Sequence, residues 1–107
     1  MIGWGMRIEY HQTGGVVGGS WRAVIDTAEL PPAKAQTLLR LVEDANFFNL
    51  PRGILRLPRL STVDHFSYTI SVMDGERKRR VQTDDIDMPA KLRPLVSYLF
   101  EHTRHDR

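Results

Sequence analysis

Apolar and polar residues alternate along several segments of the chain, and this period of two is typical of strands with one face against a core. Residues 6–11 alternate in this way, and residues 21–26 do so apart from Val24. The clearest alternation spans residues 66–72, where aromatic and branched side chains alternate with serine and threonine. We therefore predict strands in all three segments.

Two turn signals connect these strands into hairpins. Residues 13–20 hold two glycine pairs around two valines, a composition typical of a flexible hairpin connection. Asp74-Gly75 is a strong hairpin signal, so residues 78–83 should return as a fourth strand. That segment is basic and has few apolar residues, which favours a position at a sheet edge.

Two other segments have the spacing of helices. After Pro31-Pro32, apolar residues recur every three or four positions and predict a helix over about 32–45. A second apolar stripe follows Pro89 and extends to Phe100, and we expect the Asp87 carboxylate to cap its first turn.

The element order β-β-α-β-β-α predicts an α+β fold with a four-stranded, mainly antiparallel sheet and two helices. We expect an N-terminal extension over 1–5, one domain over 6–100 and a polar tail over 101–107. Residues 51–63 have no regular pattern and predict a long loop, which in a compact domain is often functional.

The strand directions decide which connections share an end of the sheet. The glycine hairpin over 13–20, the loop through Asp64 and the segment 84–87 should meet at one end. The connection over 26–32 should lie at the opposite end.

Composition limits the functions that remain. With 107 residues the chain forms one domain, and its lack of cysteine rules out disulfides and thiolate metal sites. The net charge of +2 does not give a whole-surface field for nucleic acid. No signal-peptide pattern begins the chain and no run reaches membrane-spanning length, so we expect a cytoplasmic protein, with non-classical export left open. We also expect a monomer.

No residue pattern predicts a metal, a cofactor or catalysis by the chain itself. His102 and His105 lie three apart without a third ligand nearby and suit a solvated tail. Asp84, Asp85 and Asp87 lack the glycine and distal glutamate of a calcium loop, so we interpret them as turn residues. No nucleophile elbow is present, which leaves a small hydrolase as a weak alternative.

The glycine hairpin does not match a phosphate-binding loop, because it leads into a strand and lacks a following lysine. Exposed apolar residues at a loop tip often mark recognition, and Val16 and Val17 are flanked by glycines here.

Arg77-Lys78-Arg79-Arg80 supports the main alternative, an accessory module that binds nucleic acid. Alternate residues of a strand face opposite sides, so about half of these cations share a face, and no stacking aromatic accompanies them. Nucleic acid is therefore not the favoured partner. We expect Arg52, Arg56 and Arg59 to lie nearer the other end of the strand. An interaction domain without a protease target is a further alternative.

The chain resembles the emfourin-like inhibitors of protealysin and related thermolysin-family proteases, over nearly its whole length from Met6 to about Leu99. The matching pieces, in order, are 6–9, 13–18, 25–27, 30–32, 45–48, 64–70, and Pro89 through 92–95. The family pattern has an aromatic residue after the paired glycines, and Val16 differs there.

The resemblance implies a protein that blocks a thermolysin-like zinc metalloprotease and needs no cofactor or metal of its own. In the family an aspartate from one loop is directed at the enzyme's zinc, and a neighbouring apolar loop fills substrate pockets. We assign the zinc-directed role to Asp64, with Asp84 or Asp85 as second choice.

The contact loop implied by the resemblance, and the further residues that we expect to contact the protease, complete the predicted site. They are Gly14, Gly15, Val16, Val17 and Gly18 in the loop, with Ile54, Leu55, Leu57 and His65 as additional contacts.

Overall fold

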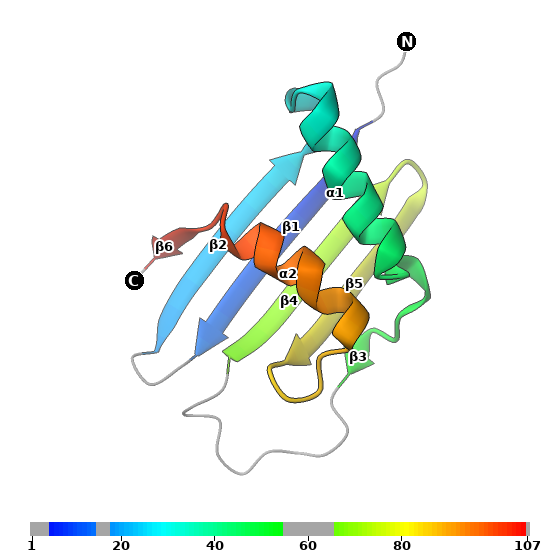
Figure 1. The fold of residues 1–107 in the computed structure, drawn as a ribbon. Helices are drawn as coiled ribbons and strands as arrows, with labels where there is room; N and C mark the ends of the chain where they lie inside the picture. Colours follow the sequence, from blue (N-terminus) through cyan, green and yellow to red (C-terminus); the bar gives the residue numbers. More distant parts are fainter. Residues whose placement is uncertain (1–4, 15–17, 55–65, 107) are drawn as a thin grey trace.

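A computed structural model describes residues 5–14, 18–54 and 66–106 of the chain (Figure 1). Strands and helices follow one another in the predicted order, with short 3-10 turns (η) between them. The elements are β1 (Met6–Gly14), β2 (Gly19–Asp26), η1 (Thr27–Glu29), α1 (Pro32–Asp44), η2 (Phe47–Asn49), β3 (Gly53–Ile54), β4 (Phe66–Asp74), β5 (Arg77–Asp84), η3 (Ala90–Leu92), α2 (Arg93–Phe100) and β6 (Arg104–Asp106).

The sheet confirms the predicted fold class. Its strand order is β3-β5-β4-β1-β2-β6, and β1, β2, β4 and β5 form the predicted antiparallel centre. Two short strands extend this centre. Gly53–Ile54 pairs parallel with β5, and Arg104–Asp106 pairs antiparallel with β2. Neither short strand is predicted from the sequence, because strands this short have no detectable period.

Both helices cover the same face of the sheet (Figure 1), and the core lies between the helices and that face. Leu38 and Val42 of α1 are buried against it, as are Leu95 and Leu99 of α2. Full burial of one such side chain stabilises the fold by about 1.5–3 kcal/mol. The sheet contributes the residues that alternate inward. They are Met6, Ile8, Tyr10, Ala23, Ile25, Ile70, Val72 and Val81.

The opposite face of the sheet has no helix over the described strands and is polar. Cross-strand register arranges its outward residues in rows that run from β2 to β5. One row is Val24, Glu9, Ser71 and Arg80, and the next is Arg22, His11, Thr69 and Gln82. Val24 interrupts the apolar pattern of β2 because it faces outward and is 59% exposed.

Three local predictions need correction. Asp87 is not the N-cap residue: the N-cap of η3 is Pro89 and that of α2 is Leu92, and the Asp87 amide donates to Asp84 Oδ1 at 2.8 Å. The segment 51–63 is not wholly a loop, since Gly53–Ile54 is a strand. The strand β5 does not lie at the sheet edge over its whole length, because β3 pairs with it at Gln82 and Thr83.

The Asp74-Gly75 turn is confirmed. Gly75 has φ of 62°, a left-handed conformation that costs glycine little. At the same end of the sheet, Gly5 lies so close to Asp26 and Ala28 that a Cβ would be 2.5 Å from Asp26 Oδ1. That carboxylate caps η1 by accepting from the Ala28 amide at 2.9 Å.

Candidate functional site

The end of the sheet away from the Asp74-Gly75 turn is where three connections meet, as the strand directions predicted. Gly14 at the end of β1 pairs with Gly19 of β2 on one side and with Phe66 of β4 on the other. Ser67 of β4 pairs with Asp84 at the end of β5. We call this end, with its described residues Gly14, Gly19, Phe66, Asp84 and Asp85, the loop end.

Much of the predicted contact loop lies outside the described residues. This applies to Gly15, Val16, Val17, Leu55, Leu57, Asp64 and His65. Gly14 and Gly18 are described and have positive φ angles of 107° and 67°, which favour glycine at both positions. Ile54 belongs to β3, where its backbone pairs with Thr83 at the same end.

The Asp84 carboxylate is buried and hydrogen-bonded to backbone amides of the next turn. Its side chain is buried, with the residue only 4% exposed. Oδ1 accepts from the amide of Ile86 at 3.0 Å and from the amide of Asp87 at 2.8 Å. These bonds satisfy backbone donors that would otherwise be unpaired in the turn after β5.

The Asp85 carboxylate fastens the start of β4 to the end of β5. Oδ2 accepts from the Phe66 amide at 3.1 Å, and Oδ1 accepts from the Tyr68 hydroxyl at 2.8 Å. The Asp85 amide donates back to the Phe66 carbonyl at 3.3 Å, and the Arg93 side chain donates to the Asp85 carbonyl at 3.0 Å. Phe66 is therefore fixed beside Gly14 by bonds on both sides.

Two tyrosines continue this polar cluster into the core. The Tyr10 hydroxyl donates to Gln12 Oε1, and the Tyr10 and Tyr68 rings lie 6.3 Å apart. Burial raises the pKa of both hydroxyls well above the ordinary tyrosine value, and the negative charge of Asp85 raises them further. Both tyrosines therefore remain neutral donors at neutral pH.

An aromatic cluster beside the loop end was not predicted from the sequence. The Trp21 ring packs edge-on against Phe66, with centroids 5.6 Å apart, and lies 6.3 Å from the Phe100 ring. The strand β1 lies between Trp21 and Phe66, with Gln12 opposite Trp21 and Gly14 opposite Phe66. Phe100 is 43% exposed, so the cluster presents an apolar surface to solvent.

Ile86 adds a second exposed apolar side chain near the same end. It is 51% exposed and follows Asp85, whose backbone bonds to Phe66. Large exposed apolar side chains near one another often mark a contact surface for another protein. The sequence contains only a weak signal for this exposed apolar surface. Trp21 and Phe100 each fit the apolar pattern of their own strand or helix, so neither stands out as a surface residue.

A family model named Emfourin matches residues 10–99, which is most of the chain. The chain belongs to the emfourin family. This family is known for inhibiting metalloproteases, so membership supports an inhibitor role in general. No curated protein and no solved structure matched the chain.

The family match covers the elements that build the loop end of this emfourin. It begins at Tyr10 within β1 and ends at Leu99 within α2. It therefore contains Trp21, Phe66 and Asp85, whereas Arg104–Asp106 lies beyond it. The strand β6 is thus an addition to the matched part of the fold.

The described part of this emfourin holds no group of three or more side chains that could bind a metal. His11 lies on the polar sheet face and its Nε2 is 3.0 Å from Ser20 Oγ. His102 stacks on Tyr98, with centroids 4.5 Å apart, and its Nδ1 is 2.8 Å from the Tyr98 carbonyl oxygen. Neither imidazole has a metal-site arrangement around it.

Within the described ranges, no helix has the length and apolar character needed to cross a membrane.

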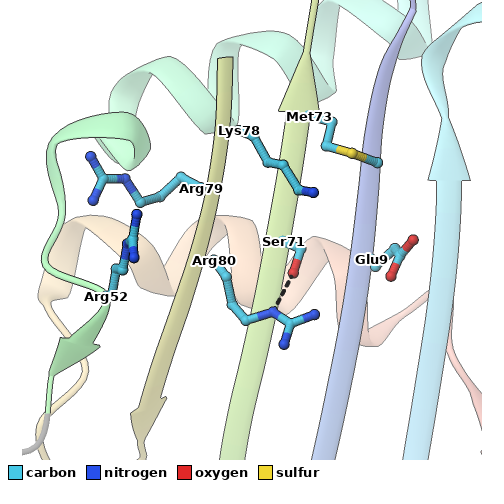
Figure 2. Close-up of a pocket in the computed structure, with 7 residues that line it drawn as sticks. All are labelled: Glu9, Arg52, Ser71, Met73, Lys78, Arg79 and Arg80. Atoms are coloured by element: carbon cyan, nitrogen blue, oxygen red, sulfur yellow. Dashed lines mark hydrogen bonds between the residues drawn. The ribbon is translucent and has the colours of Figure 1, made fainter. Parts of the chain in front are cut away.

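The basic strand β5 divides its cations between two faces, as its period requires. Arg77 lies over the Phe48 ring at 4.2 Å, and the Arg79 guanidinium donates to the Phe48 carbonyl at 2.9 Å, both on the helix side. Lys78 and Arg80 extend over the polar face (Figure 2).

Arg52 was predicted to lie nearer the other end of this basic strand; its backbone does bond near that end, but its side chain reaches the patch of cations. The Arg52 carbonyl accepts from the Gln82 amide at 2.8 Å, and its side chain lines a hollow together with Lys78 and Arg80 (Figure 2). The reason is β3, which brings residues 52–54 alongside β5. Arg56 and Arg59 lie outside the described residues.

Proposed function

We propose that this emfourin inhibits thermolysin-family zinc metalloproteases by inserting Asp64 toward the catalytic zinc, with the glycine hairpin filling adjacent substrate pockets. The observation that carries the proposal is the pairing of Gly14 with Phe66. Gly14 precedes the hairpin tip, and Phe66 follows Asp64 by two residues. This register supports a position of the carboxylate near the valines of the hairpin.

The chemistry of the target suits a carboxylate plug. A catalytic zinc in these enzymes has three protein ligands and one position for water or substrate. A carboxylate at that position displaces the attacking water and offers no bond to cleave. The bound inhibitor would therefore be a dead-end complex.

Three other aspartates are occupied by internal bonds, which supports Asp64. Asp84 is buried and caps its own turn, and both oxygens of Asp85 accept hydrogen bonds. Asp26 lies at the opposite end of the sheet, opposite Arg7, and caps η1. Freeing either Asp84 or Asp85 for a metal would break bonds that hold the loop end together.

The aromatic cluster of Trp21, Phe66 and Phe100 would extend the contact beside the inserted loops. Aromatic residues are enriched among the residues that dominate binding energy in protein interfaces. Because the rings pack against one another in the free protein, they lose little freedom on binding. We expect this surface to contact the rim of the protease cleft.

Titration of a thermolysin-family protease with the purified protein tests the proposal. Peptide cleavage should fall in proportion to added protein and reach zero near one equivalent. Complete cleavage at several equivalents, across several enzymes of this family, would refute the inhibitor role.

Substitution Asp64→Ala tests the zinc-directed carboxylate separately. We expect the inhibition constant to rise about 100-fold or more, equivalent to about 2.7 kcal/mol. Asp44→Ala is a matched control, since Asp44 is an exposed aspartate at the end of α1. If Asp64→Ala inhibits as well as the parent and the control, another group reaches the zinc.

A further inference from the structure

The polar face of the sheet contains a shallow hollow that the proposed inhibitor function does not use. Its volume is about 520 Å³, and it lies over β5, β4 and β1 (Figure 2). Lys78, Arg80 and Arg52 form one wall. Ser71 and Met73 lie on the floor, and Glu9 lies at the far side. We call this feature the basic hollow.

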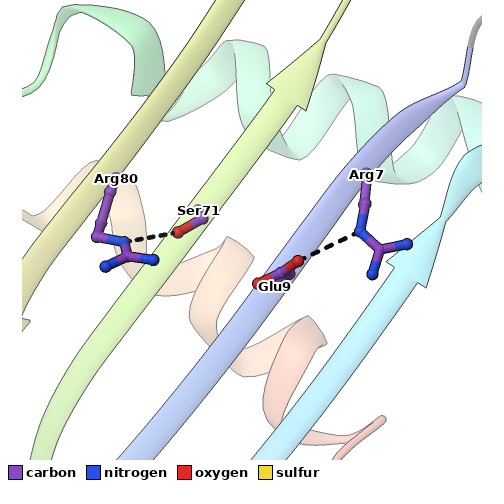
Figure 3. Close-up of polar contacts among 4 residues, drawn as sticks. All are labelled: Arg7, Glu9, Ser71 and Arg80. Atoms are coloured by element: carbon purple, nitrogen blue, oxygen red, sulfur yellow. Dashed lines mark hydrogen bonds and ion pairs between the residues drawn. The ribbon is translucent and has the colours of Figure 1, made fainter.

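The cations of the basic hollow are not neutralised within the described part of the chain. Lys78, Arg80 and Arg52 form no ion pair there. Arg80 is oriented by a neutral partner, because its Nε donates to Ser71 Oγ at 3.1 Å (Figure 3). Glu9 is 3.2 Å from Arg7 Nε, so its charge is already compensated (Figure 3).

We infer that the basic hollow binds an extended acidic segment of another protein. Lys78 and Arg80 are two residues apart on one strand, which separates them by roughly 6.6 Å. Alternate side chains of an extended peptide have the same spacing. A segment with an acidic residue at every second position can therefore place successive carboxylates against Lys78 and Arg80.

The floor of the hollow favours a peptide over a nucleic acid. No Phe, Tyr or Trp side chain is among its described lining residues, so unpaired bases have no ring to stack on. Met73 offers an apolar contact for the side chains of a peptide that alternate with its carboxylates.

The basic hollow is separate from the loop end. Ser71 lies five residues along β4 from Phe66, a distance of about 17 Å. None of the described residues that line the hollow belongs to the loop end. The inference therefore does not depend on the proposed inhibitor function.

Fluorescence anisotropy with two labelled peptides tests the inference. One peptide alternates glutamate with threonine, and the other has the same composition with its glutamates in one block. We expect the alternating peptide to bind more tightly, with affinity that falls as salt rises. The double substitution Lys78→Glu and Arg80→Glu should weaken binding of the alternating peptide by about tenfold or more.

Arg40→Glu is the matched control, because it reverses an exposed cation on α1, on the other side of the sheet. It should change the affinity by less than about twofold. Lys78→Gln with Arg80→Gln provides a second variant without introduced repulsion and should give a smaller loss in the same direction. Circular dichroism checks that each variant is folded.

Three results would each overturn the inference. The first is equal affinity for the alternating and blocked peptides. The second is binding that survives reversal of Lys78 and Arg80. The third is tighter binding of single-stranded RNA of equal charge than of the alternating peptide, which would assign the hollow to nucleic acid instead.

Discussion

Asp84 and Asp85 are neighbours at the end of β5, yet their carboxylates hold different parts of the loop end. Asp84 closes the turn that follows β5, through the amides of Ile86 and Asp87. Asp85 ties the first residue of β4 to that turn and accepts from Tyr68. Both carboxylates stabilise the free protein through internal bonds, whereas Asp64 is proposed to bind the zinc of the protease.

Substitution Asp84→Ala should therefore reduce stability and leave inhibition unchanged. It removes the acceptor of two backbone amides, and we expect the free energy of unfolding to fall by about 2 kcal/mol. Urea unfolding measures this change, and the inhibition constant is then determined under conditions where the variant is folded. A stable Asp84→Ala variant that no longer inhibits would transfer the zinc-directed role from Asp64 to Asp84.

At the scale of elements, the ends of β2, β4 and α2 converge on one aromatic cluster. Trp21, Phe66 and Phe100 each belong to a different element, and their rings meet because the β1–β4 register places Phe66 beside Gly14. The hydrophobic pattern of each element alone gives no reason to expect this contact. The cluster gives the described part of the loop end an exposed apolar surface at Phe100.

Phe100→Ser tests whether this surface contributes to inhibition. We expect the inhibition constant to rise about tenfold, because an interface aromatic of this kind contributes about 1.4 kcal/mol. Leu39→Ser is the matched control: Leu39 is 39% exposed on α1, against 43% for Phe100 on α2. Equal inhibition constants for the two variants would remove the cluster from the interface.

At the scale of the whole molecule, one sheet separates two different surfaces. Its covered face carries the core together with Tyr10 and Tyr68, and its open face is polar and holds the basic hollow.

Tyr10 and Tyr68 make the stability of the whole domain depend on pH in the alkaline range. Their hydroxyls have raised pKa values when folded, so the folded state retains protons that the unfolded state releases.

The free energy of unfolding should accordingly fall as pH rises above about 10, the ordinary tyrosine pKa. Below that pH both states hold the protons, and the stabilisation is fully present. Tyr10→Phe should reduce the slope by up to about 1.4 kcal/mol per pH unit, since one such proton is removed from the balance. Urea unfolding between pH 9 and pH 11.5, in steps of about 0.5 pH unit, measures this slope for both proteins. Identical slopes for the two proteins would contradict the assignment to Tyr10.

The sequence by itself determined the central sheet, both helices and the end of the molecule at which the loops meet. These follow from the period of apolar residues and from strand direction, which are properties of consecutive residues. The Asp74-Gly75 turn followed in the same way, because glycine tolerates the left-handed conformation found at Gly75.

Only the tertiary structure decided which carboxylates are bonded within the fold. The sequence does not distinguish Asp84 from Asp85, because their bonds are to Ile86, Asp87, Phe66 and Tyr68 in the folded state. It also left Arg52 out of the basic patch, because the two-residue strand that brings its side chain beside Lys78 and Arg80 is formed by pairing and not by local preference. Contacts between distant residues depend on register and packing, and neither has a signature in a short stretch of chain.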